Sequence, residues 1–164
     1  MDVKDYRRAL GSFPTGVTIV TAFDEQGEPW GLTANSFTSV SLDPPIISVC
    51  VAKNGRVFPT LAKASTFAVN ILADEQRDLA MHFASNTENR FAGTPWQRQG
   101  EGAPLFPEAA ACLDCVVHER VDAGDHEILL GRVVHYTHTA NPPLTYCRGV
   151  FFAAHQHEPA QVQA

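Results

Sequence analysis

Short segments rich in β-branched and aromatic residues recur along this chain, and turn-forming residues separate them. Most of the links between these segments resemble hairpins rather than the helical crossovers that join parallel strands. This pattern predicts an antiparallel sheet. The expected strands are residues 17–23, one or two strands within 30–41, and then 46–52, 66–71, 112–122, 127–139 and 145–154.

Helices are few in this pattern. A short first helix is predicted from the helical spacing of Val3, Tyr6, Leu10 and Phe13, with Asp2 as its cap. Two further helices are expected over residues 57–64 and 74–85. The fold class that fits is mainly β, with an antiparallel barrel and a few helices outside it.

Length and charge limit what the chain can do. Its 164 residues, 45% of them apolar, suit a single domain over residues 1–164 with a disordered tail from about residue 156. The net charge of −6 argues against nucleic acid or an anionic membrane as a partner. The longest apolar segment, residues 46–52, is too short to span a bilayer, and the N-terminus lacks the apolar core of a signal peptide. We therefore expect a cytoplasmic protein with reduced thiols.

Residues 87–107 hold glycines, prolines and polar residues without a clear period, so we expect a long irregular segment. A loop of this length in a compact domain is commonly a lid or a contact surface. The candidates for contact with a second subunit are its large apolar residues, Phe91, Trp96, Leu105 and Phe106.

Several familiar motifs are absent from the sequence. No Gly-x-Gly-x-x-Gly occurs, and Val17 stands where a phosphate-binding loop needs lysine. Cys112 and Cys115 have the spacing of half a zinc site, but residues three apart on a strand face opposite sides, and no second pair is present. We therefore expect no metal centre, while the role of these two cysteines stays open.

Three short segments could carry chemistry. In Thr33-Ala34-Asn35-Ser36, small residues would let main-chain amides approach the edge of a flat ligand. The same residues are also typical of a strand end with hydroxyl groups on the surface. Lys53-Asn54-Gly55-Arg56 could bind a phosphate or be a solvated turn. In Gly124-Asp125-His126 a carboxylate could orient a histidine, or the segment could be an ordinary turn.

Taken together and in this order, the segments resemble the short-chain flavin reductases, the reductase components of two-component flavin-dependent monooxygenases. The resemblance runs from about Tyr6 to Phe152. It is carried by Phe13-Pro-Thr-Gly-Val17, Thr33-Ala-Asn-Ser-Phe37, Ser39-Val-Ser-Leu-Asp-Pro-Pro45, Phe67-Ala-Val-Asn-Ile-Leu72 and Gly124-Asp-His126.

This resemblance implies an FMN-binding split β-barrel, usually a homodimer, that transfers a hydride from NADH or NADPH to FMN or FAD and supplies reduced flavin to a monooxygenase. His126 would be the catalytic residue, beside the nicotinamide. The cofactor-binding residues would be Thr33, Ala34, Asn35 and Ser36 at the flavin ring and ribityl chain, Cys50, Val51 and Lys53 on the next strand, Arg56 near the phosphate, Phe83, Ala84 and Arg90 in the closing segment, and Tyr146 and Arg148 on the nicotinamide side.

Other functions remain open at this point. The chain could be a split-barrel protein that binds flavin or haem without turnover. An oxidase of a pyridoxamine phosphate would need more cations than Lys53 and Arg56. A β-barrel scaffold without a ligand would leave the combined motifs unexplained. The sequence does not decide between FMN and FAD, between NADH and NADPH, or between a bound and an exchanging flavin.

Overall fold

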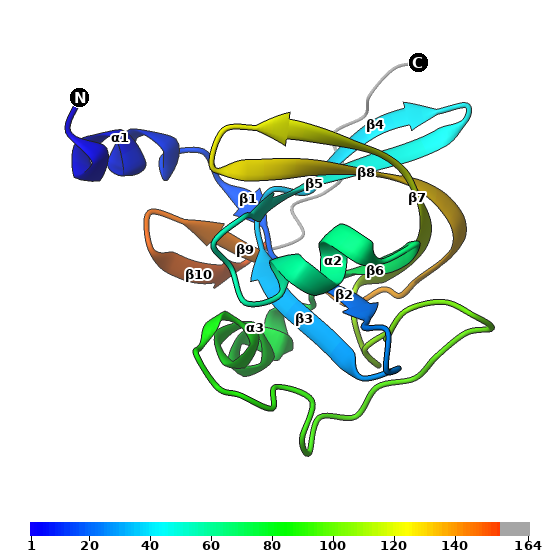
Figure 1. Cartoon of the computed structure of the whole chain (residues 1–164). Helices are drawn as coiled ribbons and strands as arrows, with labels where there is room; N and C mark the ends of the chain where they lie inside the picture. Colours follow the sequence, from blue (N-terminus) through cyan, green and yellow to red (C-terminus); the bar gives the residue numbers. More distant parts are fainter. Residues whose placement is uncertain (155–164) are drawn as a thin grey trace.

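A computed structural model describes residues 1–154 of the chain, so the predicted disordered tail from about residue 156 lies outside the described residues. The structure is mainly β, with two antiparallel sheets and a few helices, as predicted (Figure 1). The larger sheet has the order β3-β2-β6-β7-β8-β5-β4. Its strands are β2 (Thr18–Phe23), β3 (Pro29–Ala34), β4 (Thr38–Leu42), β5 (Pro45–Ala52), β6 (Thr66–Ile71), β7 (Ala111–Ala123) and β8 (His126–His138).

The larger sheet curls without closing, so β3 and β4 remain its edges while β3 comes close to β5 (Figure 1). The smaller sheet has the order β1-β9-β10, with β1 (Thr15–Gly16), β9 (Leu144–Cys147) and β10 (Val150–Ala153). The helices are α1 (Val3–Leu10), α2 (Phe58–Lys63) and α3 (Arg77–Ala84), and the 3-10 turn η1 (Asp74–Gln76) leads into α3. None of these helices is long and apolar enough to cross a membrane.

The hydrophobic core lies inside the curled sheet. Phe67, Val69 and Val20 are completely buried there, and Leu129 on β8 packs against them. A second cluster joins the sheet to α3 and the smaller sheet, around Phe83. The predicted central strand, β5, lies between β8 and β4, and it buries one face while the other face stays half-open.

Two predicted elements differ from the structure. The single strand expected over 145–154 is wrong, because the chain reverses at Arg148 and Gly149 to give β9 and β10. Both residues have positive φ, 50° and 85°, which is the conformation of a tight two-residue hairpin turn. The helix expected from 74 begins instead as η1, where the Gln76 side chain accepts a hydrogen bond from the amide of Ala73.

The large apolar residues of the segment 87–107 were predicted to contact a second subunit, and for three of the four this is wrong. Phe91, Leu105 and Phe106 are buried in the chain's own core, while Trp96 remains partly exposed. Two buried polar side chains hold the segment to the sheet. Thr21 Oγ1 donates to Pro104 O at 2.7 Å, and Asn70 Oδ1 accepts from Phe106 N at 2.9 Å.

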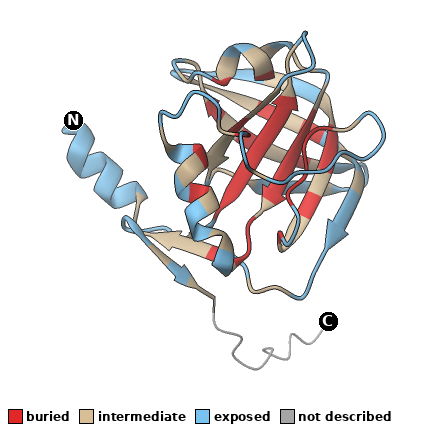
Figure 2. Ribbon diagram, turned by 90° about the horizontal axis from the view of Figure 1, so that it is seen from below, coloured by how far each residue is buried: buried red, intermediate tan, exposed pale blue. Residues whose placement is uncertain are grey.

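The first helix forms as predicted, and Asp2 Oδ1 accepts a hydrogen bond from Lys4 N at 2.8 Å. Its apolar face, however, meets no core. No residue of α1 is buried, and the helix stands away from the sheets (Figure 2). The exposed apolar residues here are Val3, Tyr6, Leu10 and Phe13.

Packing across the sheet leaves no room for a side chain at Gly131. A Cβ there would lie 2.9 Å from Cys115 Cβ and closer still to the ring of Phe67, which is completely buried. We predict that Gly131→Ala lowers the free energy of unfolding by about 1–3 kcal/mol. Gly16→Ala is the control, since a Cβ at Gly16 has no neighbour within 4 Å. Equal midpoints for both variants in urea unfolding would contradict this account of the packing.

Candidate functional site

The edge strand β3 has main-chain groups without a strand partner. The carbonyl of Gly31 accepts a hydrogen bond from Arg90 Nη1 at 2.8 Å, so the main chain of Gly31 points away from β2. Residues alternate in an antiparallel pair, so the main chain of Thr33 points the same way. The Thr33 side chain instead turns to α3, where Oγ1 donates to Ala80 O at 2.6 Å. Thr33 thus leaves its main-chain groups open to a ligand.

A crevice of about 480 Å³ lies where β3 ends, between α3 and the smaller sheet. Five of the predicted site residues line it, namely Thr33, Ala34, Asn35, Ala84 and Tyr146. Gly149 also lines it, and sequence reasoning missed the other residues of its wall, which are Val17, Met81 and Phe151. The walls are largely apolar, and Asn35 adds a polar amide.

A second cavity of about 730 Å³ shares Asn35, Tyr146 and Gly149 with this crevice and extends along α1. The predicted residue Arg148 lines it. Thr15 also lines it, and its Oγ1 is buried without a hydrogen-bond partner in the described structure. A buried hydroxyl without a partner costs stability unless a ligand or water bonds to it.

The predicted segments on β3 and β5 are joined by Ser36. Its Oγ accepts a hydrogen bond from Cys50 N at 2.9 Å and donates one to Cys50 O at 3.2 Å. Cys50 is half-buried, whereas the Val51 side chain is buried in the core. The Phe83 side chain is buried as well. Val51 and Phe83 therefore offer almost no surface to a ligand in this structure, and neither lines one of the cavities described here.

Lys53 is turned toward the tip of the β7–β8 hairpin. Its Nζ contacts Asp122 Oδ2 at 2.6 Å and Gly124 O at 2.7 Å, and its amide donates to Asp125 O at 3.0 Å. The hydrogen bond from Lys53 and its charge hold the pKa of Asp122 below its usual value. Lys53 therefore fastens the hairpin tip to the end of β5, a role that the sequence did not indicate.

The same tip carries His126, outside the three cavities described in this subsection. Its Nδ1 lies 2.7 Å from Asp125 Oδ1, and this contact lowers the pKa of Asp125. The ring is therefore oriented by the neighbouring carboxylate, as predicted for Gly124-Asp125-His126. In the sheet His126 pairs with Ala52, so it lies beside the end of β5.

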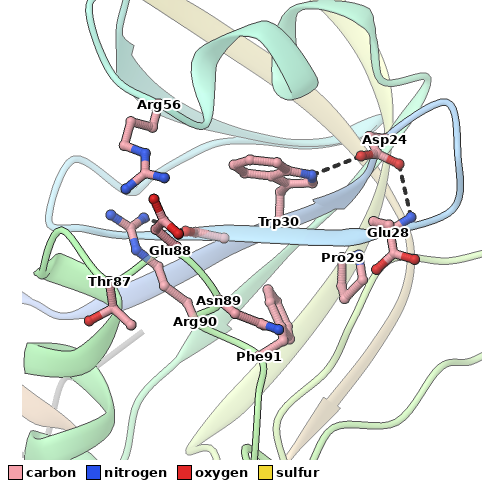
Figure 3. Close-up of a pocket in the computed structure, with 11 residues that line it drawn as sticks. Asp24, Glu28, Pro29, Trp30, Arg56, Thr87, Glu88, Asn89, Arg90 and Phe91 are labelled. Carbon is pink, nitrogen blue, oxygen red and sulfur yellow. Dashed lines mark hydrogen bonds between the residues drawn. The ribbon is translucent and has the colours of Figure 1, made fainter.

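Arg56 and Arg90, two of the three predicted arginines, meet in a third cavity, of about 300 Å³, at the start of β3 (Figure 3). Arg56 Nη1 donates to Asn86 O at 2.9 Å. Burial and the charge of Arg56 lower the pKa of Arg90. The two guanidinium groups therefore lie close together, as a phosphate site requires. Trp30, which sequence reasoning did not select, lines the same cavity.

Cys112 and Cys115 lie away from these cavities, in different buried clusters. Burial raises the pKa of Cys115 to about 12 and also raises that of Cys112. These thiols are therefore inert packing groups rather than redox groups. Within residues 1–154, no group of three or more His, Cys, Asp or Glu side chains is placed to hold a metal ion.

The arrangement suits a flavin. Such a ligand has a flat ring with polar edges, a polyol chain and a phosphate. The crevice offers apolar walls with the free main-chain groups of β3, and Thr15, whose buried hydroxyl has no partner in the described structure, lines the cavity beside it. The paired arginines come from the segments before α2 and after α3, and they lie beside the start of the same strand. The apolar walls and main-chain groups suit the ring and its polar edges, the hydroxyl suits the polyol chain, and the arginines suit the phosphate.

Comparison with known proteins agrees with this chemistry. The model of the flavin reductase like domain matches residues 10–155. The chain belongs to the flavin reductase family. The resemblance stated from the motifs is therefore confirmed over nearly the whole chain.

Three relatives of this flavin reductase family member are informative. A reductase subunit of stachydrine N-demethylase from Rhizobium meliloti is 47% identical over 93% of this chain and 66% of its own length. The reductase component of a flavin-dependent trigonelline monooxygenase from Acinetobacter baylyi is 45% identical over 92% of this chain and 48% of its own length. This chain thus spans about half to two thirds of those relatives.

The third relative is a solved structure. An NADH:FAD oxidoreductase from Streptomyces globisporus, in complex with NAD and FAD fragments, matches with a TM-score of 0.86 and 39% identity. The match covers 99% of this chain and 96% of that one. The two folds therefore agree over the part of the chain that the structure describes.

Proposed function

We propose that this protein is an NAD(P)H-dependent flavin reductase, which transfers a hydride from NADH or NADPH to FMN or FAD. The crevice at the end of β3 carries this proposal, because it combines apolar walls with free main-chain groups and the Asn35 amide. Its relative from Streptomyces globisporus is an NADH:FAD oxidoreductase. Of the site residues named from the motifs, those that line the crevice are proposed to act in it, and the others around it.

The protein's part in such a reaction is to hold two flat rings face to face. The flavin supplies the ring that takes up a hydride, and the nicotinamide supplies the hydride. The main chain at Thr33 and Asn35 would bind the polar edge of the flavin, while Ser36 keeps β3 and β5 at a constant distance. Met81 and Tyr146 would exclude water. Correct placement of two reactants can contribute about 7–11 kcal/mol to catalysis.

His126 is proposed to bind the nicotinamide side, with Asp125 orienting its ring and Lys53 fixing the hairpin tip. Its exposure and its position outside the crevice suit a group that meets a second, exchanging substrate. In this account Lys53 acts through the hairpin and not through direct contact with the flavin.

We also propose that the reduced flavin serves a separate monooxygenase. The relative from Acinetobacter baylyi is the reductase component of a monooxygenase, which supports this partner. The four cysteines are free, as is usual in a reducing compartment, and this supports a cytoplasmic location.

The proposed activity is tested by mixing the purified protein with NADH or NADPH and then with FMN or FAD. We expect absorbance at 340 nm, the nicotinamide band, to fall catalytically only when flavin is present. A protein that binds flavin and leaves NADH and NADPH unoxidised would be a binding protein, and the proposed reaction would be wrong.

For His126 we predict a specific kinetic effect. His126→Ala should raise KM for NAD(P)H about tenfold and change the flavin dissociation constant less than twofold, because the ring contacts only the nicotinamide. His138→Ala is the control, since His138 is exposed at the other end of β8. Steady-state kinetics and flavin fluorescence measure the two constants. An equal loss of affinity for both substrates would contradict the assignment.

A homodimer is proposed from the exposed apolar surface. Helix α1 has eight residues, and isolated helices shorter than about 12–15 residues are marginal in water. Its apolar face is nevertheless exposed, and so are Leu42 (90%) and Val40 on the edge strand β4. A second copy of the chain that covers these surfaces would stabilise both the helix and the sheet edge.

Light scattering tests the homodimer. We expect twice the chain mass of 17.9 kDa at micromolar concentration. Leu10→Asp should shift the protein toward the monomer, because it places a charge on the apolar face of α1, whereas Leu10→Met should leave the dimer intact. A monomeric mass for the unaltered protein would overturn this proposal.

A further inference from the structure

The cavity that holds Arg56 and Arg90 has two chemically different ends. Its arginine end lies against the segment after α3, and its other end is formed by Trp30, Asp24 and Glu28 at the start of β3 (Figure 3). We call it the Trp30 pocket. A single phosphate would occupy only the arginine end, so the remaining groups need a larger ligand.

The arginine end holds two guanidinium groups that form no ion pair within the described residues. Arg56 and Arg90 take part in none of the ion pairs within residues 1–154, and their bonds go to main-chain carbonyls. Glu88 lines the same pocket without pairing to either arginine. Arg90 Nε is buried and has no partner among the described residues. Two neighbouring guanidinium groups in this state favour a ligand with more than one negative charge.

The far end offers an aromatic face with fixed polar groups. Trp30 Nε1 donates to Asp24 Oδ2 at 2.9 Å, which holds the indole ring in place. Asp24 Oδ1 accepts from the amides of Gln26 and Glu28, at 2.9 and 2.8 Å. Figure 3 shows the indole between the arginines and Asp24. An aromatic face beside hydrogen-bond acceptors suits a purine, which stacks and carries an exocyclic amine.

The pocket and the flavin crevice follow one another along β3. Pro29, Trp30 and Gly31 line the pocket, whereas Thr33 and Ala34 line the crevice. The segment after α3 runs beside both of them, with Ala84 at the crevice and Arg90 at the pocket. Four residues of strand span about 13 Å, which is the scale of a ribityl phosphate chain. A flavin bound in the crevice would therefore direct its phosphate toward the arginines.

We propose that the Trp30 pocket binds the adenosine diphosphate end of FAD, with the phosphates at Arg56 and Arg90 and the adenine on Trp30, so that this protein prefers FAD to FMN. The proposal rests on the proposed flavin reductase function, because it needs a flavin in the crevice. FMN ends at its phosphate and would leave the indole, Asp24 and Glu28 without a contact.

The test compares riboflavin, FMN and FAD on the purified full-length protein by flavin fluorescence and calorimetry. We expect affinity to rise at FMN, which adds a phosphate, and again by about tenfold at FAD, which adds the adenosine. This series needs no variant, so it does not depend on how a substitution folds. Equal affinities for FMN and FAD would overturn the proposal.

Two variants locate the effect. Trp30→Ala should weaken FAD about tenfold and FMN less than twofold, so that the preference disappears, while Trp30→Phe should keep most of it because the aromatic face remains. If Trp30→Ala instead raises the dissociation constant for NADH and leaves FAD unchanged, the pocket holds the nicotinamide nucleotide, and the proposal is wrong.

The two proposals fail in different ways. A protein that binds and reduces FMN and FAD equally retains the proposed function but lacks the adenosine site. If the protein binds neither flavin in calorimetry and oxidises no NADH, both the adenosine site and the proposed flavin reductase function are wrong.

Discussion

The free edge of β3 is the constraint on which the rest of this structure depends. A seven-stranded sheet that curls without closing has to end somewhere, and here it ends at a strand whose outward main-chain groups have no strand partner. Arg90 covers part of that edge, at Gly31, and the Thr33 side chain ties the strand to α3. The uncovered part forms the floor of the crevice. An unpaired edge, which is a hazard in many sheets, becomes here a row of hydrogen-bonding groups for a ligand.

Much of the fold could be predicted from local patterns. Strand segments rich in β-branched residues, the Asp2 cap and the Gly124 turn act within a few residues of one another, so the sequence alone indicates them. The irregular segment 87–107 was misjudged because its anchors, Thr21 and Asn70, are distant in sequence. Its aromatic residues have no period, and nothing local distinguishes a buried loop from an exposed one.

The candidate site was predictable in part for the same reason. The motif on β3 follows from residue types, and its residues line the crevice. The cation pair expected from the sequence was Lys53 with Arg56, whereas Arg56 meets Arg90 in the Trp30 pocket, because the segments before α2 and after α3 come together only in the folded chain. The direction of Lys53 could not be predicted, because Asp122 and Gly124 approach it only once β5 and β8 pair. Trp30 was not selected, because a tryptophan beside a turn is ordinarily a packing residue.

The position of helix α1 couples association of the chains to ligand binding. Leu10 and Phe13 line the same cavity as Asn35 and Tyr146, so one segment is both an exposed apolar face and a wall near the crevice. A second chain that covers this helix therefore also changes the free energy of ligand binding in the cavity beside it. Thermodynamic linkage makes such an effect reciprocal: a ligand that tightens association of the chains is itself bound more tightly by the associated form, by the same factor.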